Sequence, residues 1–196
     1  MDAITLPSTA RLVLVAAPRA ARLQMLALAA RLALAGPLRV LDGGNSFDAF
    51  AVARHLRGHT ARVEPVLNRI RIQRAFTCYQ LLTLLNETPP APEPTLVLDM
   101  LATFQDESVY LAERRRLLGE CALRLRFLSL ALSPSSLLGV NSTEGGCGPV
   151  VVSARPPDGQ AGAAGLYALL QAACDAVLVP PPDPLPPAAA PSLPGF

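Results

Sequence analysis

Apolar runs alternate with helical patterns along the chain, starting close to its amino end. Residues Arg11 to Ala16 (RLVLVA) have the apolar character of a buried strand. Ala20 to Ala35 follows with the alanine and leucine content of a good helix, which Gly36-Pro37 closes. Leu38 to Asp42 (LRVLD) is predicted as a second strand, interrupted by Gly43-Gly44. The chain therefore opens with a strand, a helix and a second strand.

The same alternation continues through the rest of the chain. Ser46 is expected to cap a helix from Phe47 to about Arg57, and Thr77 a helix through about Asn86. Two further helices are predicted, from about Ser108 to Leu132 and from Gly162 to Cys174. The remaining strands are predicted at Arg69 to Ile72, Thr95 to Asp99, Leu137 to Asn141, Pro149 to Ala154 and Ala176 to Val179.

Strands that alternate with helices are typical of an α/β fold. We expect a mostly parallel sheet with helices on both faces, in three layers, because parallel strands are joined by crossover helices. Residues 1–179 are expected to form one domain. In the tail, residues 180–196, eight of seventeen residues are proline and most of the others are small, so we expect that tail to be disordered.

The composition favours a protein with a large core and no membrane span. Hydrophobic residues make up 51% of the chain, charged residues 16%, and the net charge is +2. Arg19, Arg22 and Arg31 interrupt the most apolar stretch too often for a bilayer-spanning helix. The amino end lacks the pattern of a secretory signal, and the four cysteines are far apart, so we expect reduced thiols and a cytoplasmic location.

The chain contains seventeen arginines and no lysine. Chemistry that needs a lysine amine, such as a Schiff base or the phosphate-binding lysine of a P-loop, is therefore excluded. No nucleophile elbow is present, and both histidines lie in one short segment, which argues against a Ser/His/Asp or Cys/His catalytic set.

Two segments carry a resemblance to a known family. The first is VLDGGNSFDAFAVARHL, with Asp42, Ser46 and Phe47; the second is RAFTCYQLLTLL, with Arg74, Ala75, Phe76, Thr77 and Gln80. Together they resemble the RecA/RadA recombinase family of P-loop ATPases, and the order of elements extends the likeness from about Arg11 to Val179. The resemblance implies a RecA-like core with a nucleotide site after the first strand.

The residues at that nucleotide site depart from the family pattern. A P-loop uses glycines to turn backbone N–H groups toward the phosphates, a lysine to neutralise them and a Ser/Thr hydroxyl for magnesium. Gly44 occupies the place of the family's catalytic glutamate, and Asp99 alone retains an acid where the family has one near magnesium; we expect Asp99 to cap a turn or the next helix. The vestigial positions are Ala16, Ala17, Pro18, Arg19, Ala20, Ala21, Arg22, Leu23 and Asp99.

Other charged and aromatic segments also suggest binding sites. The loops in the place of the family's DNA-binding loops, ATFQDES and STEGGCG, carry acids and no arginine, which argues against direct DNA binding. His55 and His59 could share a metal, but no third ligand lies near them in the sequence.

The arginines of the long predicted helix are expected to form a solvated face that pairs with Glu113 and Glu120; they are Arg114 to Arg116, Arg124 and Arg126. The segment Phe50 to Ala53 imitates the Phe-x-x-Ala hook of the recombinases, and we expect it to pack in the core.

The sequence thus favours a non-catalytic RecA-like accessory protein without a cofactor, a pseudo-ATPase that acts on a protein partner in DNA recombination or repair. That partner would be a catalytic RecA-fold ATPase or another repair factor. One alternative is a weak ATP-binding subunit, in which Arg19 or Arg22 replaces the lysine and ATP and magnesium bind. Another is a RecA-fold regulator of cell division.

Overall fold

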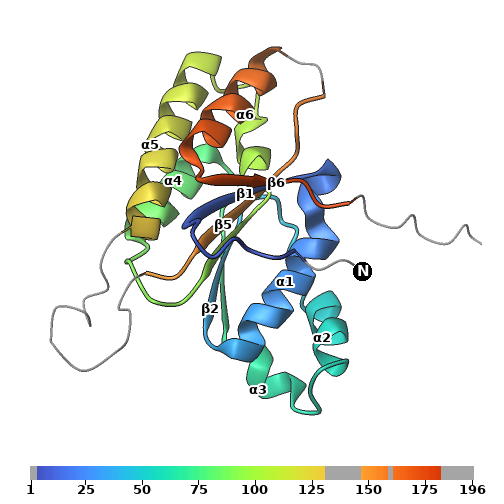
Figure 1. Cartoon of the computed structure of the whole chain (residues 1–196). Coiled ribbons are helices and arrows are strands. Elements are labelled where there is room, and N and C mark those ends of the chain that lie inside the picture. Colours follow the sequence, from blue (N-terminus) through green and yellow to red (C-terminus); the bar gives the residue numbers. More distant parts are fainter. Residues whose placement is uncertain (1–3, 131–146, 159–160, 182–196) are drawn as a thin grey trace, which may run out of the picture.

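The computed structural model describes residues 4–130, 147–158 and 161–181, and these residues form an α/β fold (Figure 1). Its sheet has six strands, all parallel, in the order β3-β2-β4-β5-β1-β6. The strands are β1 (Leu12–Ala16), β2 (Leu38–Asp42), β3 (Ile70–Arg74), β4 (Thr95–Leu98), β5 (Val150–Ala154) and β6 (Ala176–Leu178). The expected α/β class and parallel sheet are confirmed.

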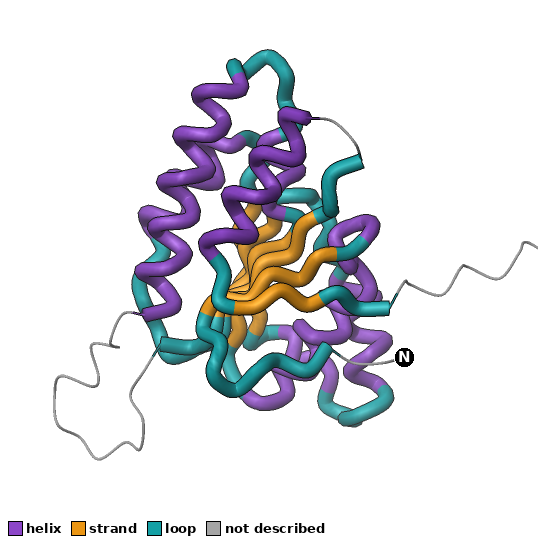
Figure 2. The backbone as a smooth tube through the Cα atoms, turned by 45° about the horizontal axis from the view of Figure 1, so that its top comes forward, coloured by secondary structure: helices purple, strands orange, loops and turns teal. Residues whose placement is uncertain are grey.

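Helices cover both faces of the sheet, so that the strands lie between two helical layers (Figure 2). One layer comprises α1 (Arg22–Ala35), α2 (Ala49–Arg57) and α3 (Val63–Leu67), and the other α4 (Cys78–Glu87), α5 (Leu111–Leu130) and α6 (Ala161–Ala173). Two short 3-10 helices, η1 (Pro18–Ala21) and η2 (Met100–Phe104), follow β1 and β4. Each layer buries its own apolar cluster against the sheet, which gives the three layers that the sequence predicts.

The central strands are buried on both faces because both helical layers pack on them. Every residue of β1, β4 and β5 is buried, which explains why these segments read as continuous apolar runs. The edge strand β3 is mostly exposed, and its alternation of isoleucine with polar residues reflects that position. The apolar runs therefore mark the centre of the sheet.

Several elements begin or end at residues other than those predicted from the sequence. Helix α2 begins at Ala49, and its cap is Asp48, whose carboxylate accepts from the amides of Phe50 and Ala51, instead of Ser46. Ser46 lies three residues before the helix, and both its amide and its hydroxyl donate to the Asp42 carboxylate. The segment Val63–Leu67, expected to be irregular, is a helix.

Other expectations fall outside the described residues. These are the strand at Leu137 to Asn141, the end of the long helix beyond Leu130, most of STEGGCG and the tail beyond Pro181. Within the described part of the chain, none of the helices combines the length and the apolar character that crossing a membrane requires.

Candidate functional site at the carboxyl edge of the sheet

The parallel sheet brings the ends of all its strands to one edge, where ligands of open α/β folds bind. The segments that leave β1, β2, β4 and β5 lie side by side there, because these strands are neighbours in the order β2-β4-β5-β1. The vestigial positions Ala16 to Leu23 and Asp99 all belong to this edge. The structure therefore brings the candidate residues together.

The turn between β1 and α1 has an unusual backbone. Arg19, Ala20 and Ala21 have φ values of 52°, 51° and 52°, in the left-handed region that glycine adopts most easily. The methyl groups of Ala20 and Ala21 are buried. The turn thus keeps a glycine-like course although it contains no glycine.

The amides of this turn are largely used within the protein. Pro18 has no N–H, Ala17 donates to the carbonyl of Ala154, Ala20 donates to Ala17, and Arg22 donates to Arg19. A P-loop instead presents a row of free N–H groups to the phosphates. The amides of Arg19 and Ala21, and those of the first turn of α1, are not among these internal bonds.

The cations of the turn do not replace the missing lysine. Arg22 Nε donates to the carbonyl oxygen of Ser46 at 2.9 Å, and its guanidinium lies 4.0 Å from Asp48. Arg19 is exposed and has no partner among the described residues. Leu23, the last of the vestigial positions of this turn, carries no oxygen in its side chain that could bind magnesium. The residues present therefore do not fit a magnesium triphosphate.

A buried carboxylate organises the loop after β2. Asp42 is inaccessible to solvent and accepts hydrogen bonds from the amides of Ser46 (2.8 Å) and Phe47 (3.1 Å). Arg74 Nε lies 3.3 Å from Asp42, and the Ala75 amide donates to the Asp42 carbonyl. The two segments that carry the family resemblance are thus joined through Asp42 and Arg74. Sequence analysis identified both residues without showing that they pair.

Asp99 lies half-buried in the same edge and is packed against the loop after β2. A Cβ atom at Gly44 would lie 2.5 Å from Asp99 Cβ and 2.8 Å from its Oδ2. Burial raises the pKa of Asp99, the charge of Arg155 lowers it, and the charge of Asp42 raises it. Because a side chain at position 44 would overlap Asp99, this backbone leaves no room for a glutamate there.

Asp99 was expected to cap a turn or the next helix, and its side chain does not cap the helix. Asp99 stands at the N-cap position of η2, with a left-handed φ of 44°, but its side chain makes no capping hydrogen bond. Its amide donates to Ser153 Oγ at 2.9 Å, which ties the end of β4 to β5. Arg155, which sequence analysis did not single out as a site residue, follows β5 directly and supplies the charge facing Asp99.

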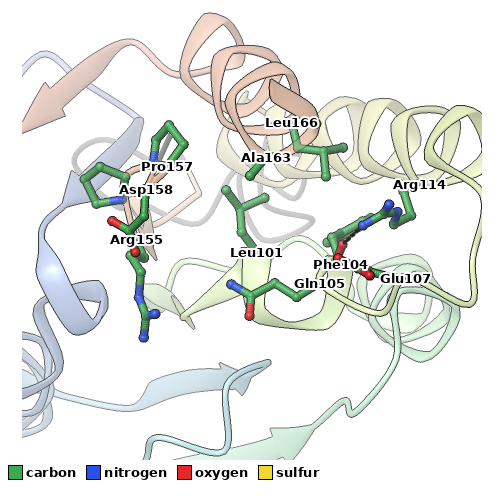
Figure 3. Close-up of a pocket in the computed structure, with 12 residues that line it drawn as sticks. Leu101, Phe104, Gln105, Glu107, Arg114, Arg155, Pro157, Asp158, Ala163 and Leu166 are labelled. Atoms are coloured by element: carbon green, nitrogen blue, oxygen red, sulfur yellow. Dashed lines mark hydrogen bonds between the residues drawn. The ribbon is translucent and has the colours of Figure 1, made fainter. Parts of the chain in front are cut away.

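A cavity of about 500 Å³ lies beside this edge, between η2, the start of α5 and the segment after β5 (Figure 3). Leu101, Phe104 and Leu166 contribute apolar surface. Figure 3 shows Arg155 and Asp158 on one side and Glu107 and Arg114 on the other. The lining residues are Leu101, Phe104, Gln105, Glu107, Arg114, Arg155, Pro156, Pro157, Asp158, Gly162, Ala163 and Leu166.

The cavity lining combines two arginines with two carboxylates, those of Glu107 and Asp158. Arg114 Nη1 donates to the Phe104 carbonyl at 3.0 Å, and the buried Arg114 Nε has no partner. Among the described residues, the lining contains no serine, threonine, cysteine, histidine or tyrosine. Opposite charges thus lie beside an apolar surface, which is the composition of small-molecule binding sites.

The thiols and imidazoles elsewhere do not add a catalytic set. All four cysteines are free; burial raises the pKa of Cys121 to about 12 and that of Cys174 to about 11, so both remain protonated thiols near neutral pH. Helix α2 ends at Arg57, so His59 lies beyond the helix that holds His55. Among the residues that the structure describes, no three His, Cys, Asp or Glu side chains form a metal-binding group.

Most arginines of α5 serve structural contacts. Arg116 pairs with Glu113 and Glu120, as expected for a solvated face, and Arg126 pairs with Asp175. Arg124 donates to the carbonyls of Leu85, Asn86 and Thr88. The expected packing of Phe50 to Ala53 is wrong at its first residue, because Phe50 is 83% exposed while the other three are buried.

Comparison of the chain with protein-family models and with curated proteins finds no match. The family resemblance therefore depends on the two segments joined by Asp42 and Arg74.

Proposed function

We propose that the chain is a non-catalytic RecA-like accessory protein, a pseudo-ATPase that acts in the cytoplasm by binding another protein. The observation that carries this proposal is the closed turn between β1 and α1. The amides of Ala17, Ala20 and Arg22 are bonded internally, the Arg22 guanidinium donates to the Ser46 carbonyl, and the loop after β2 has no space for a glutamate. A fold of this type without its chemistry suits a binding role.

The resemblance to RecA/RadA recombinases is the reason for assigning the pathway to DNA recombination or repair. In support of it, the two similar segments form one hydrogen-bonded unit through Asp42, Arg74 and Ala75. We propose a catalytic RecA-fold ATPase, or another repair factor, as the partner. Direct DNA binding is not part of the proposal, since the loop around Asp106 and Glu107 has no cation to bind phosphate.

Co-expression with the recombination proteins of the same genome tests this function. We expect a stable complex with one of them in size-exclusion chromatography, and a change in the partner's DNA-dependent ATPase activity. A monomer that associates with none of these proteins would contradict the proposal. A complex with a tubulin-like protein would favour the division regulator instead.

Arg19 favours the alternative of a weak ATP-binding subunit, because its guanidinium is exposed and unpartnered within the described residues. In a complex, Arg19 would reach a phosphate held by the neighbouring subunit. The variant Arg19→Ala separates the two functions: loss of the partner's ATPase activity with the complex intact would support the alternative.

A further inference from the structure

Helix α2 presents two different faces. Val52 and Leu56 are fully buried in the cluster between α1 and the sheet. Phe50, Arg54 and Arg57 are exposed, and their spacing of four and three residues places them on one side of the helix. We call these three residues the α2 face. It points away from the core.

The α2 face is cationic, and its arginines have no partner among the residues that the structure describes. The guanidinium groups of Arg54 and Arg57 form no hydrogen bond or ion pair with the described residues, and the same is true of Arg62 just beyond the helix. Helix α2 contains no acid; Asp48 before it is used by the amides of Phe50 and Ala51. Glu64 is the nearest acid along the chain after Arg62. This distinguishes the α2 face from α5, where Arg116 pairs with two glutamates.

Helix stability explains only part of this arrangement. Arg54 and Arg57 lie in the last turn, where cations interact favourably with the helix dipole. Phe50 lies in the first turn and is 83% exposed, so it contributes little to the core. An aromatic residue beside unpaired arginines is the composition that protein interfaces favour, since these residues supply most hot spots.

We propose that the α2 face binds an acidic segment of a partner protein that also carries an apolar side chain. Carboxylates of that segment pair with Arg54 and Arg57 in the bidentate geometry that guanidinium groups allow, and the apolar side chain covers Phe50. This inference rests on the proposed binding function and specifies its surface.

Other anionic partners match this surface less well. A membrane-bound helix inserts its apolar face, but the apolar face of α2 is buried against the core. Single-stranded nucleic acid needs a series of aromatic stacking platforms, and the α2 face offers only Phe50. Charge complementarity combined with one aromatic side chain therefore points to an acidic protein segment.

A displayed library of short random peptides, selected against the full chain, tests the proposal. We expect acidic peptides with at least one apolar residue to be enriched, and their Kd to rise at least about tenfold with Phe50→Ala or with Arg54→Glu/Arg57→Glu. The matched control is Arg71→Glu/Arg115→Glu with Tyr110→Ala, which changes the charge equally and removes another exposed aromatic. Circular dichroism checks that each variant is folded. If the variant Arg54→Glu/Arg57→Glu does not fold, the single substitution Arg57→Ala at an exposed position replaces it in the binding measurement.

The outcomes separate the surface from the function. If acidic peptides are not enriched, or bind the α2 variants as tightly as the wild type, the proposed surface is wrong. If these same variants still form a complex with a recombination protein, the accessory function remains supported although the proposed surface is wrong. Tighter binding of a single-stranded oligonucleotide than of any peptide, abolished by Arg54→Glu/Arg57→Glu, would overturn the proposal in favour of nucleic acid.

Discussion

Residues with a left-handed backbone gather at the carboxyl edge of the sheet. The non-glycine residues with positive φ in the described part of the chain are Arg19, Ala20, Ala21, Asn45 and Asp99, which follow β1, β2 and β4. Each such residue costs about 1–2 kcal/mol, and strain of this kind persists where the surrounding structure imposes it. The edge thus retains a strained course that glycines would adopt freely.

Replacing Arg19 with glycine is expected to stabilise the protein. Glycine removes the strain at a φ of 52° but increases the entropy of the unfolded chain, so we expect a net gain of about 0.5–1 kcal/mol. The measurement is the free energy of unfolding in urea. Ala164→Gly, at an exposed position within α6, should lower it by about 0.5–1 kcal/mol. Equal effects of the two substitutions would show that Arg19 is unstrained.

Substitution at Gly44 tests the packing of Asp99. We expect Gly44→Ala to destabilise the protein by about 1–3 kcal/mol, because the new Cβ would lie 2.5 Å from Asp99 Cβ. The adjacent Gly43→Ala is the control, since its Cβ would make contacts of 3.4 Å. Asp99→Gly in the Gly44→Ala background should restore part of the loss in thermal denaturation. No recovery would mean that Asp99 does not occupy this space.

The protonation of Asp99 makes stability depend on pH. Burial raises its pKa above the unfolded value, so the folded state holds the proton more tightly and stability falls as pH rises from about 4 through the folded pKa. Asp99→Asn cannot lose a proton, so its stability relative to the wild type should increase over this range and then level off. Urea unfolding at a series of pH values measures this difference. A constant difference would contradict the assigned environment.

Residue patterns predicted caps better than they predicted strain. Thr77 caps α4 as expected, accepting from the Gln80 amide, because a threonine before an apolar periodic run is a local signal. Ala20 and Ala21 give no sign of a left-handed turn, since alanine favours helix. The role of Asp99 was predicted wrongly because a position at the end of a strand is a signal in the local sequence. The packing of Asp99 against Gly44 depends on the tertiary fold, which the local sequence does not show.

At the scale of elements, arginines hold helix ends to the rest of the fold. Arg69 donates to the carbonyls of Ala33 and Leu34 near the end of α1. Arg124 donates to the carbonyls of Leu85, Asn86 and Thr88 around the end of α4, and its guanidinium lies 4.6 Å from the Phe127 ring centroid. Arg124 reaches its three carbonyls from two separate nitrogens of a planar guanidinium, Nε and Nη2, whereas a lysine carries all of its donors on a single nitrogen and cannot span the same positions.

Arg124→Lys is therefore expected to lower the free energy of unfolding by about 1–2 kcal/mol, although the charge is kept. Arg71→Lys is the control, because Arg71 is exposed on β3 without a side-chain partner among the described residues, and should change stability by less than about 0.5 kcal/mol. Chemical denaturation of both variants measures these changes in the free energy of unfolding. A neutral Arg124→Lys would show that the carbonyl contacts contribute nothing.

Long helices and the buried strand Leu38–Asp42 were predictable, whereas the short helices were not. The strand Leu38–Asp42 has its expected bounds, and α1, α4 and α6 lie within two residues of theirs. Helices α3 and η2, of five residues each, are too short to show a helical period. The pairing of Asp42 with Arg74 needs the register of β2 with β3, which composition does not reveal.

At the scale of the whole molecule, the class of fold follows from the alternation of strands and helices, but the order of strands does not. Strand β5 lies between β1 and β4, although more than fifty residues separate it from each of them along the chain. This order places Arg155 beside Asp99 and forms one wall of the cavity. Long-range pairing of this kind depends on the packing of both helical layers, so the candidate site emerged only from the fold.

The measurement that tests the central claim most directly is a calorimetric titration of the full chain with ATP and magnesium. Because the amides of Ala17, Ala20 and Arg22 are bonded internally and the Arg22 guanidinium donates to the Ser46 carbonyl, we expect no saturable binding of ATP with a Kd below about 1 mM. Titration with magnesium alone provides the baseline. Saturable binding of ATP tighter than this, abolished by Arg22→Ala, would show that the turn opens to a triphosphate and would contradict the account.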